Sequence, residues 1–202
     1  MAERREFHPP HVYEENACYF ITASIAGRRR LLDTGPKRAL LLDVLTNAVR
    51  DYDVTLYAWV VLANHYHLLL LTGDTIPIWK LIKRLHGKSA IQLNELDAAP
   101  GRQVWYQYWD RCPRSERAFW CFFNYIHINP LKHGYVQSTD GTLLVENRQL
   151  KIAGGRSPDV HEALAGYPHS SYHYYMHEYG EAFMTGAWTH HPIPEHLADD
   201  DP

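Results

Sequence analysis

The sequence predicts an α+β fold, a ferredoxin-like βαββαβ sandwich with one additional helix, and three observations support this prediction. Segments with strand and helix patterns follow one another in the order strand, helix, strand, strand, helix, strand, helix. The chain has 202 residues, 46% of them hydrophobic, which suits one domain with its own core. A short turn at Ala63-Asn64 separates the second strand from the third, so these two strands are expected to form a hairpin.

Strand patterns occupy residues 17–26, 54–62, 65–72 and 104–109, where apolar, β-branched and aromatic residues alternate or run together. Apolar residues recur at helical spacing in residues 36–49, 76–96 and 116–128. Pro36 opens the first of these helices, Ser115 is the expected N-cap of the third, and Pro130 is its expected end. Further along, residues 154–158 are typical of a loop and residues 170–179 of a short aromatic helix.

Composition and charge narrow the class of protein. No apolar run approaches the roughly 20 residues of a membrane span, and no signal-peptide core follows the first six residues. Cys18, Cys112 and Cys121 form no CxxC pair, which favours a reduced compartment, and we expect a cytoplasmic protein. Residues 1–137 hold 17 Lys and Arg against 13 Asp and Glu, whereas residues 138–202 hold 3 against 10. The first two-thirds of the chain is therefore mildly basic and the last third acidic.

Two histidines interrupt a hydrophobic strand. His65 and His67 are two residues apart, so their side chains point to the same face while Tyr66 points to the other. Burying imidazoles costs free energy unless they are bonded, and neighbouring neutral imidazoles are common metal ligands. The pattern therefore fits half of a divalent-metal site, or a pair of hydrogen-bonded core histidines, or histidines on a solvent-facing sheet.

A second candidate cluster lies on the helix predicted for residues 116–128 and just after it. Tyr125 and Asn129 are four residues apart, so they share one helical face. Asn129 offers an amide oxygen to a metal, and a tyrosine phenol can serve as a covalent nucleophile. A free phenol has a pKa of about 10, so such a nucleophile needs help from a metal or a base. Taken alone, Tyr125 also fits ordinary helix packing.

The chain resembles the single-tyrosine HUH transposases, and among them the REP-associated tyrosine transposases. Residues 59–69 (WVVLANHYHLL) resemble the family's His-hydrophobic-His strand, and residues 124–136 (NYIHINPLKHGYV) resemble its catalytic-tyrosine helix. A weaker similarity lies at residues 167–172 (YPHSSY), and the resemblance covers roughly residues 15–175. The chain departs from the family in having Ala63 where Pro is usual and Asn129 where insertion-sequence relatives have Gln.

The resemblance implies a mechanism. His65, His67 and Asn129 would hold one Mg²⁺ or Mn²⁺, with His127 as an alternative third ligand or as a helper in proton transfer. Tyr125 would be the catalytic nucleophile, cleaving single-stranded or hairpin DNA and forming a 5′-phosphotyrosine with a free 3′-OH. Aromatic residues Trp105, Tyr106, Tyr108 and Trp109 would stack bases or pack the sheet. The residues expected to bind DNA phosphates are Arg28, Arg29, Arg30, Lys80, Lys83, Arg84, Lys88, Arg111, Arg114, Arg117, Lys132 and His133.

Several alternatives remain open. A replication initiator or conjugative relaxase uses the same chemistry but usually carries further domains. A domesticated, catalytically idle binder of palindromic DNA, or another histidine-based phosphoesterase, would also suit parts of the pattern. We expect residues 1–137 to form the catalytic domain and residues 138–202 an acidic extension packed on or near it. The protein is expected to be a monomer or a homodimer, with no membrane association.

Overall fold

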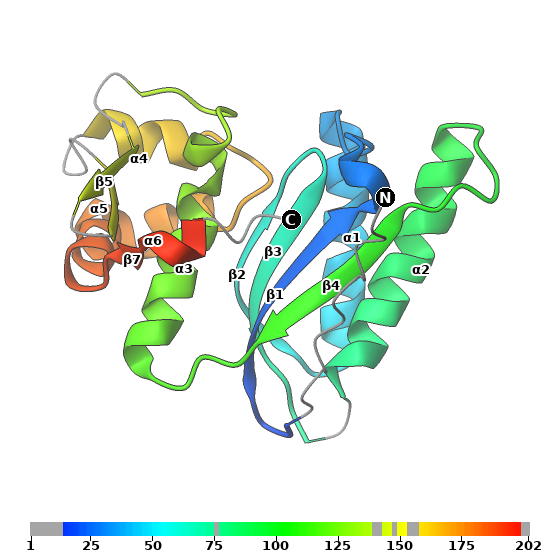
Figure 1. Ribbon diagram of the computed structural model, residues 1–202, viewed down its shortest axis with the longest axis horizontal. Helices are drawn as coiled ribbons and strands as arrows, with labels where there is room; N and C mark the ends of the chain where they lie inside the picture. Colours follow the sequence, from blue (N-terminus) through cyan, green and yellow to red (C-terminus); the bar gives the residue numbers. More distant parts are fainter. Residues whose placement is uncertain (1–13, 75–76, 139–142, 147–148, 153–157, 199–202) are drawn as a thin grey trace, which may run out of the picture.

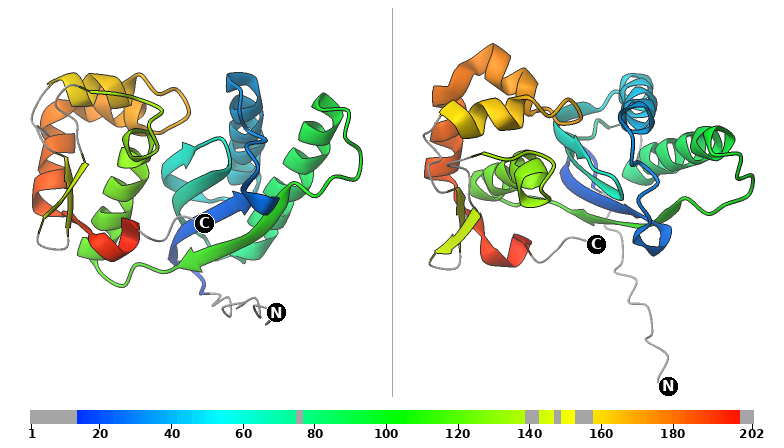
Figure 2. Two further views of the ribbon diagram at one scale, coloured as in Figure 1. Left: turned by 45° about the horizontal axis from the view of Figure 1, so that its top comes forward. Right: turned by 90° about the horizontal axis from the view of Figure 1, so that it is seen from above.

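A four-stranded antiparallel sheet forms the centre of the molecule. The computed structural model describes residues 14–74, 77–138, 143–146, 149–152 and 158–198. The strands are β1 (Cys18–Ile25), β2 (Thr55–Val61), β3 (His65–Leu71) and β4 (Trp105–Arg111), in the order β2-β3-β1-β4. Helices α1 (Gly35–Asp51) and α2 (Ile78–Leu96) cover one face, and α3 (Glu116–Lys132) lies on the other (Figure 1, Figure 2). The predicted α+β sandwich with an additional helix is confirmed.

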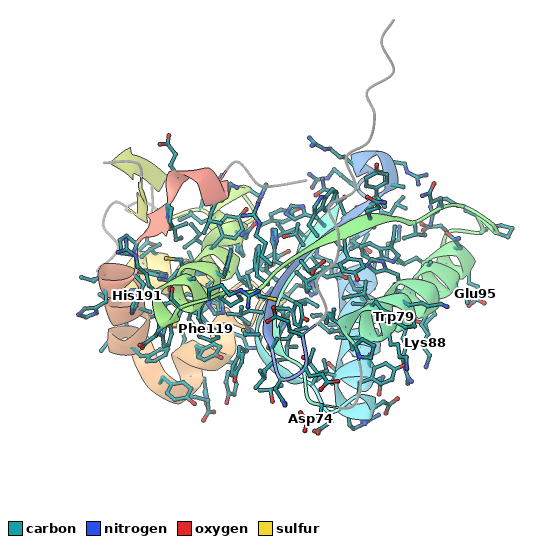
Figure 3. The ribbon with its side chains drawn as sticks, turned by 60° about the horizontal axis from the view of Figure 1, so that its bottom comes forward. Asp74, Trp79, Lys88, Glu95, Phe119 and His191 are labelled. Carbon is teal, nitrogen blue, oxygen red and sulfur yellow. The ribbon has the colours of Figure 1, made fainter. Side chains whose placement is uncertain are left out.

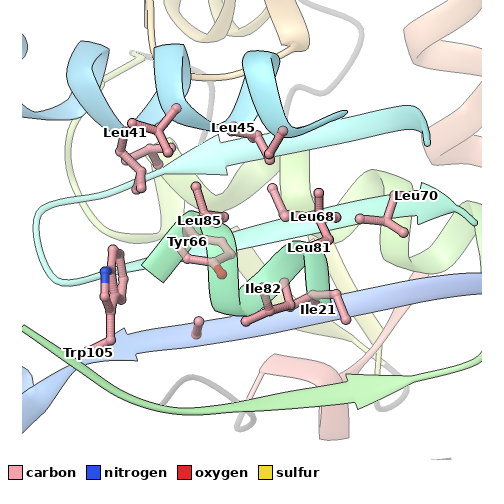
Figure 4. Packing of buried hydrophobic residues seen from close by; sticks show 14 of the residues in the cluster. Ile21, Leu41, Leu45, Tyr66, Leu68, Leu70, Leu81, Ile82, Leu85 and Trp105 are labelled. Carbon is pink, nitrogen blue, oxygen red and sulfur yellow. The ribbon is translucent and has the colours of Figure 1, made fainter. Parts of the chain in front are cut away.

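Alternation along the central strands gives the sheet two different faces. In β1, Tyr19, Ile21, Ala23 and Ile25 pack in the cluster under α1 and α2, whereas Phe20 packs in the cluster around α3. Tyr66 joins Leu41, Leu45 and Leu85 on the α1–α2 side (Figure 4). Because side chains two apart share a face, the residues flanking Tyr66 point toward α3. The functional candidates of β3 therefore face the additional helix.

Helix α3 begins as predicted but ends later than predicted. The Ala118 N–H donates to Ser115 Oγ at 3.1 Å, which is the expected N-cap bond. Pro130 does not end the helix, so that prediction is wrong, and α3 continues to Lys132. The end is set by Gly134 at φ +68°, because its N–H donates to the Leu131 carbonyl and the next N–H donates to the Pro130 carbonyl. These two bonds form a Schellman motif, which needs a residue in the left-handed region.

The C-terminal third adds a second sheet and two longer helices beside α3. Strands β5 (Leu143–Glu146), β6 (Gln149–Ile152) and β7 (Ile193–Pro194) pair in that order, and they were not predicted. The remaining elements are η1 (Ala26–Arg28), α4 (Pro158–Ala165), α5 (Tyr172–His190) and α6 (Glu195–Ala198). The helix predicted at 170–179 continues to His190 through a kink at Gly180, where φ is 78°. Of the predicted loop 154–158, all but Pro158 lies outside the described residues.

Residues 167–171 lie along the exposed edge of β2. The Val61 N–H donates to the His169 carbonyl at 2.8 Å, and the Ser171 N–H donates to the Trp59 carbonyl at 2.9 Å. Tyr167 Oη donates to the Val61 carbonyl at 2.7 Å. This segment satisfies backbone groups that an edge strand would otherwise expose. Among the described residues, no helix has the length and apolar character needed to cross a membrane.

Candidate active site

The histidines of β3 lie side by side on the face of the sheet that α3 covers. Their ring centroids are 5.0 Å apart, and both residues are buried. His65 Nδ1 is 2.8 Å from Asn64 Oδ1, and His67 Nδ1 is 2.8 Å from Thr22 Oγ1 on the neighbouring strand. Both rings are thus oriented through Nδ1, so Nε2 is the nitrogen that would bind a metal. Such partners on the far nitrogen are usual for histidines that bind metals.

Helix α3 brings Tyr125 and Asn129 to this face. The Tyr125 ring centroid is 5.3 Å from that of His67 and 6.0 Å from that of Phe20. Asn129 Nδ2 donates to the Tyr125 carbonyl at 2.6 Å, which fixes the amide plane. Asn129 Oδ1 is buried and accepts no hydrogen bond from any described residue. A buried acceptor without a donor calls for an explanation, and a bound cation is one.

The donor types agree with a divalent metal only if an amide oxygen takes part. No group of three His, Cys, Asp or Glu side chains within the described ranges could hold a metal ion. Two imidazole nitrogens and one amide oxygen are donors that Mn²⁺ accepts, and Mg²⁺ accepts the oxygen more readily than the nitrogens. His65, His67 and Asn129 therefore fit the metal that the sequence led us to expect.

The last turn of α3 adds two further side chains. The His133 ring centroid is 5.0 Å from that of His65, although His133 itself is exposed. Lys132 Nζ donates to Tyr125 Oη at 3.2 Å. Both residues were predicted to contact DNA. Their positions beside a candidate ligand and beside the candidate nucleophile were not predicted, because they depend on α3 continuing past Pro130.

His127 is not brought together with these residues. It is fully buried on the opposite side of α3, where its Nε2 is 2.7 Å from Ser171 Oγ. Phe123, Tyr172 and Tyr175 surround its ring, with the Phe123 ring centroid 4.3 Å away. Burial lowers the pKa of His127 to about 3, so the ring is neutral. These contacts describe a residue that anchors α3 to the segment along β2.

The predicted DNA-binding residues fall into separate groups. Lys80, Lys83, Arg84 and Lys88 lie on α2, across the sheet from α3, as Figure 3 shows for Lys88 and for Phe119 of α3. Arg84 pairs with Asp51 there. Arg111 ends β4, and Arg114 and Arg117 lie in the loop and the first turn that lead into α3. Arg114 pairs with Glu14 at 2.7 Å. The α2 group therefore lies on the face of the sheet opposite the histidine pair.

The basic turn after β1 lies near the end of α3. Arg28, Arg29 and Arg30 are all exposed, and Arg29 donates from Nε to the Ala26 carbonyl at 2.9 Å. The guanidinium carbons of Arg30 and Arg38 are 5.9 and 5.8 Å from the Tyr135 ring centroid. Tyr135 Oη accepts from the Ala63 N–H at 2.8 Å, in the turn that leads to His65. Sequence reasoning did not single out Arg38 or Tyr135, since their proximity follows from tertiary packing.

The four aromatic residues of β4 divide between the two faces. Trp105 is buried, stacks on His86 with centroids 4.5 Å apart, and donates to Ser89. Tyr108 packs against the same core, because a bulge shifts the register between the two residues. Trp109 is opposite Thr22, which is opposite His67, so Trp109 lies on the histidine face with the Tyr106 ring 6.2 Å away.

Comparison with known proteins shows what this chain is similar to. The family described as "Transposase IS200 like" matches residues 15–112. A REP-associated tyrosine transposase from Escherichia coli (strain K12) is 28% identical over 143 residues, which is 68% of this chain and 77% of that protein. The chain is therefore similar to the REP-associated tyrosine transposases. Transposases process DNA, so the family is one of DNA-processing enzymes.

A solved structure shares the fold of this protein. The structure of a REP-associated tyrosine transposase bound to a REP hairpin aligns with a TM-score of 0.62, covering 85% of this chain and 86% of the other. The sequences are 18% identical, so this likeness concerns the fold. The family match ends at residue 112, before α3. The interpretation of Tyr125 on α3 therefore depends on the geometry described above.

Proposed function

We propose that this protein is a transposase that cleaves one strand of hairpin-bearing DNA through Tyr125 and keeps the 5′ end as a phosphotyrosine. The proposal depends on one observation: Tyr125 lies beside the histidine pair. The ring centroids of Tyr125 and His67 are 5.3 Å apart. A nucleophile beside a metal site that can bind the scissile phosphate is the arrangement such a reaction needs. The relative solved with a REP hairpin supports hairpin DNA as the substrate class.

His65, His67 and Asn129 would hold Mg²⁺ or Mn²⁺. The buried Asn129 Oδ1 and the Nδ1 hydrogen bonds of both histidines support this ligand set. When bound, the metal would polarise a non-bridging oxygen of the scissile phosphate. The chain's own contribution is to orient the two rings from a rigid strand and to bring Tyr125 to them from a packed helix.

In the proposed reaction, one bond to phosphorus forms and one breaks. Tyr125 Oη forms a bond to phosphorus and loses its proton, while the bond from phosphorus to the 3′ oxygen breaks and that oxygen gains a proton. The products are a 5′-phosphotyrosine and a 3′-OH. Because the covalent link keeps the phosphodiester energy, a 3′-OH can later attack it and rejoin a strand without ATP.

The DNA path would run along the histidine face of the sheet. Trp109 and Tyr106 are at the edge of this face and are candidates for base stacking. Arg28 and Arg30 are exposed, and Arg30 lies over Tyr135, which is bonded to the turn that leads to His65. Arg111 is opposite Phe20 on the histidine face, and Arg117 is exposed in the first turn of α3. Phosphate binding by the basic α2 residues would require DNA to reach the opposite side of the molecule, so we exclude them from this path.

A labelled-oligonucleotide assay tests the proposal. The protein is incubated with single strands that carry a hairpin, with label on the 5′ or the 3′ side of the cleavage site, and products are separated on denaturing gels. We expect a covalent adduct that keeps the fragment 3′ of the cut, requires Mn²⁺ or Mg²⁺, and is lost with chelator. Tyr125→Phe should abolish the adduct, whereas the matched variant Tyr179→Phe, at a position 56% exposed, should not.

Two results would contradict parts of the proposal. If Tyr125→Phe still formed the adduct, the assignment of the nucleophile would be wrong. If the wild-type protein bound hairpin DNA but formed no adduct with any metal, the protein would be an idle binder of palindromic DNA. Light scattering on the same samples measures whether the protein is a monomer or a homodimer.

A further inference from the structure

A lysine from the end of α3 reaches the candidate nucleophile. Lys132 Nζ is 3.2 Å from Tyr125 Oη and 5.1 Å from the centroid of the Tyr125 ring. The ammonium group is much closer to the oxygen than to the ring centre, so its contact is a hydrogen bond to the oxygen and only secondarily a cation–π contact. Tyr125 is 1% exposed, and Lys132 is half-buried. The pair is therefore partly shielded from water, where charged hydrogen bonds are stronger.

The register of α3 produces this contact. Lys132 follows Tyr125 by seven residues, which is close to two full turns, so both side chains lie on one helical face. Side chains on a helix lean toward its N-terminus, which directs the long lysine back to the tyrosine. The contact exists only because the helix continues through Pro130 and ends at the Gly134 motif.

We propose that Lys132 is a positioning residue for the Tyr125 nucleophile, holding Oη toward the histidine pair and neutralising the negative charge that gathers on it. The inference rests on the proposed function. During attack, Oη gives up its proton and bonds to phosphorus. In the reverse step the bond from phosphorus to Oη breaks and the same oxygen leaves with negative charge. A fixed ammonium group beside this oxygen stabilises both directions, as donors aimed at developing charge do.

This role differs from that of an ordinary phosphate-binding lysine. A lysine that only binds a phosphate raises DNA affinity and the salt dependence of binding, and its removal lowers the salt slope by about one. A lysine that serves Oη alters the rate of adduct formation at saturating DNA and leaves affinity nearly unchanged. The two roles are therefore separated by measuring binding and single-turnover rate on the same variants.

The test compares Lys132→Met, Lys132→Arg and Lys88→Met in the full-length protein. Lys88→Met is the matched control, because Lys88 is an exposed lysine on α2 across the sheet. Hairpin affinity is measured by fluorescence anisotropy over a series of salt concentrations, and adduct formation by single-turnover kinetics with Mn²⁺. We expect Lys132→Met to slow adduct formation about 100-fold with affinity unchanged, and Lys132→Arg to restore part of the rate. Lys88→Met should match the wild-type rate.

A spectroscopic measurement detects the contact between Lys132 and Tyr125 in the absence of metal and DNA. With 3-fluorotyrosine at position 125, the ¹⁹F resonance should move in Lys132→Met, move less in Lys132→Arg, and stay in place in Lys88→Met. Two outcomes would overturn the inference while leaving the proposed function standing: an unchanged adduct rate in Lys132→Met, or a reduced affinity and salt slope with a normal rate at saturation. A wild-type protein that forms no adduct would overturn the proposed function itself, and this inference with it.

Discussion

Replacing His127 with alanine should destabilise the fold and spare the chemistry. The residue is fully buried, and its removal leaves a space between the rings of Phe123, Tyr172 and Tyr175. Deleting a buried side chain of this size costs about 3 kcal/mol. Ser171 Oγ loses one partner but keeps the Trp59 N–H at 3.0 Å, so this loss adds about 1 kcal/mol. The free energy of unfolding should therefore fall by about 4 kcal/mol.

The measurement is denaturant unfolding at pH 7, followed by circular dichroism, together with single-turnover adduct formation well below the melting temperature. His127→Gln serves as the second variant, because an amide fills much of the space and can still bond Ser171. We expect Gln to recover part of the stability and both variants to keep the adduct rate within a few-fold. If His127→Ala left stability within about 1 kcal/mol of wild type but abolished the adduct, the structural role would be refuted and a proton-transfer role supported.

Three other predictions concern the helix end, pH and the metal. Gly134→Ala should lower the free energy of unfolding by about 1 kcal/mol, since φ is +68° and a Cβ would meet nothing within 4 Å, so only backbone strain contributes. Unchanged denaturation curves would contradict this. Burial lowers the pKa of His86 to about 3, so the unfolded chain takes up a proton below about pH 6.5 that the folded chain refuses. Between pH 7 and pH 5 this histidine should therefore cost up to about 2 kcal/mol of stability, and His86→Gln should flatten the measured pH dependence; parallel curves would argue against it. Asn129→Ala should weaken Mn²⁺ binding at least about 10-fold by calorimetry, and an unchanged affinity would remove Asn129 from the ligand set.

The sequence predicted those parts of the fold and site that depend on local periodicity. A period of two along β3 is enough to place His65 and His67 on one face, and helical spacing is enough to align Tyr125 with Asn129. The contacts with Thr22 and Asp51, by contrast, depend on strand register and helix packing, which no local pattern specifies. For the same reason, the sequence did not predict that the basic residues of α2 lie across the sheet from α3.

The error at Pro130 shows how a local rule can hide a contact. Proline disfavours helix in the residue before it and removes one N–H, so ending the helix there follows from the sequence. In the structure Pro130 lies in the last turn of α3, where the loss of one bond is tolerated, and the two bonds around Gly134 close the end. The extra turn carries Lys132 to Tyr125 and His133 to His65.

The candidate site is assembled from two supports that are held in different ways. The histidines are oriented within the sheet and its hairpin turn, through bonds to Thr22 and Asn64. Tyr125 reaches them from α3, whose opposite side is tied by His127 to Ser171, and Ser171 is in turn bonded to the backbone of β2. The segment that covers the edge of β2 therefore also links that strand to the helix that carries Tyr125. Ser171, far along the chain from β2, thus ties this strand to α3.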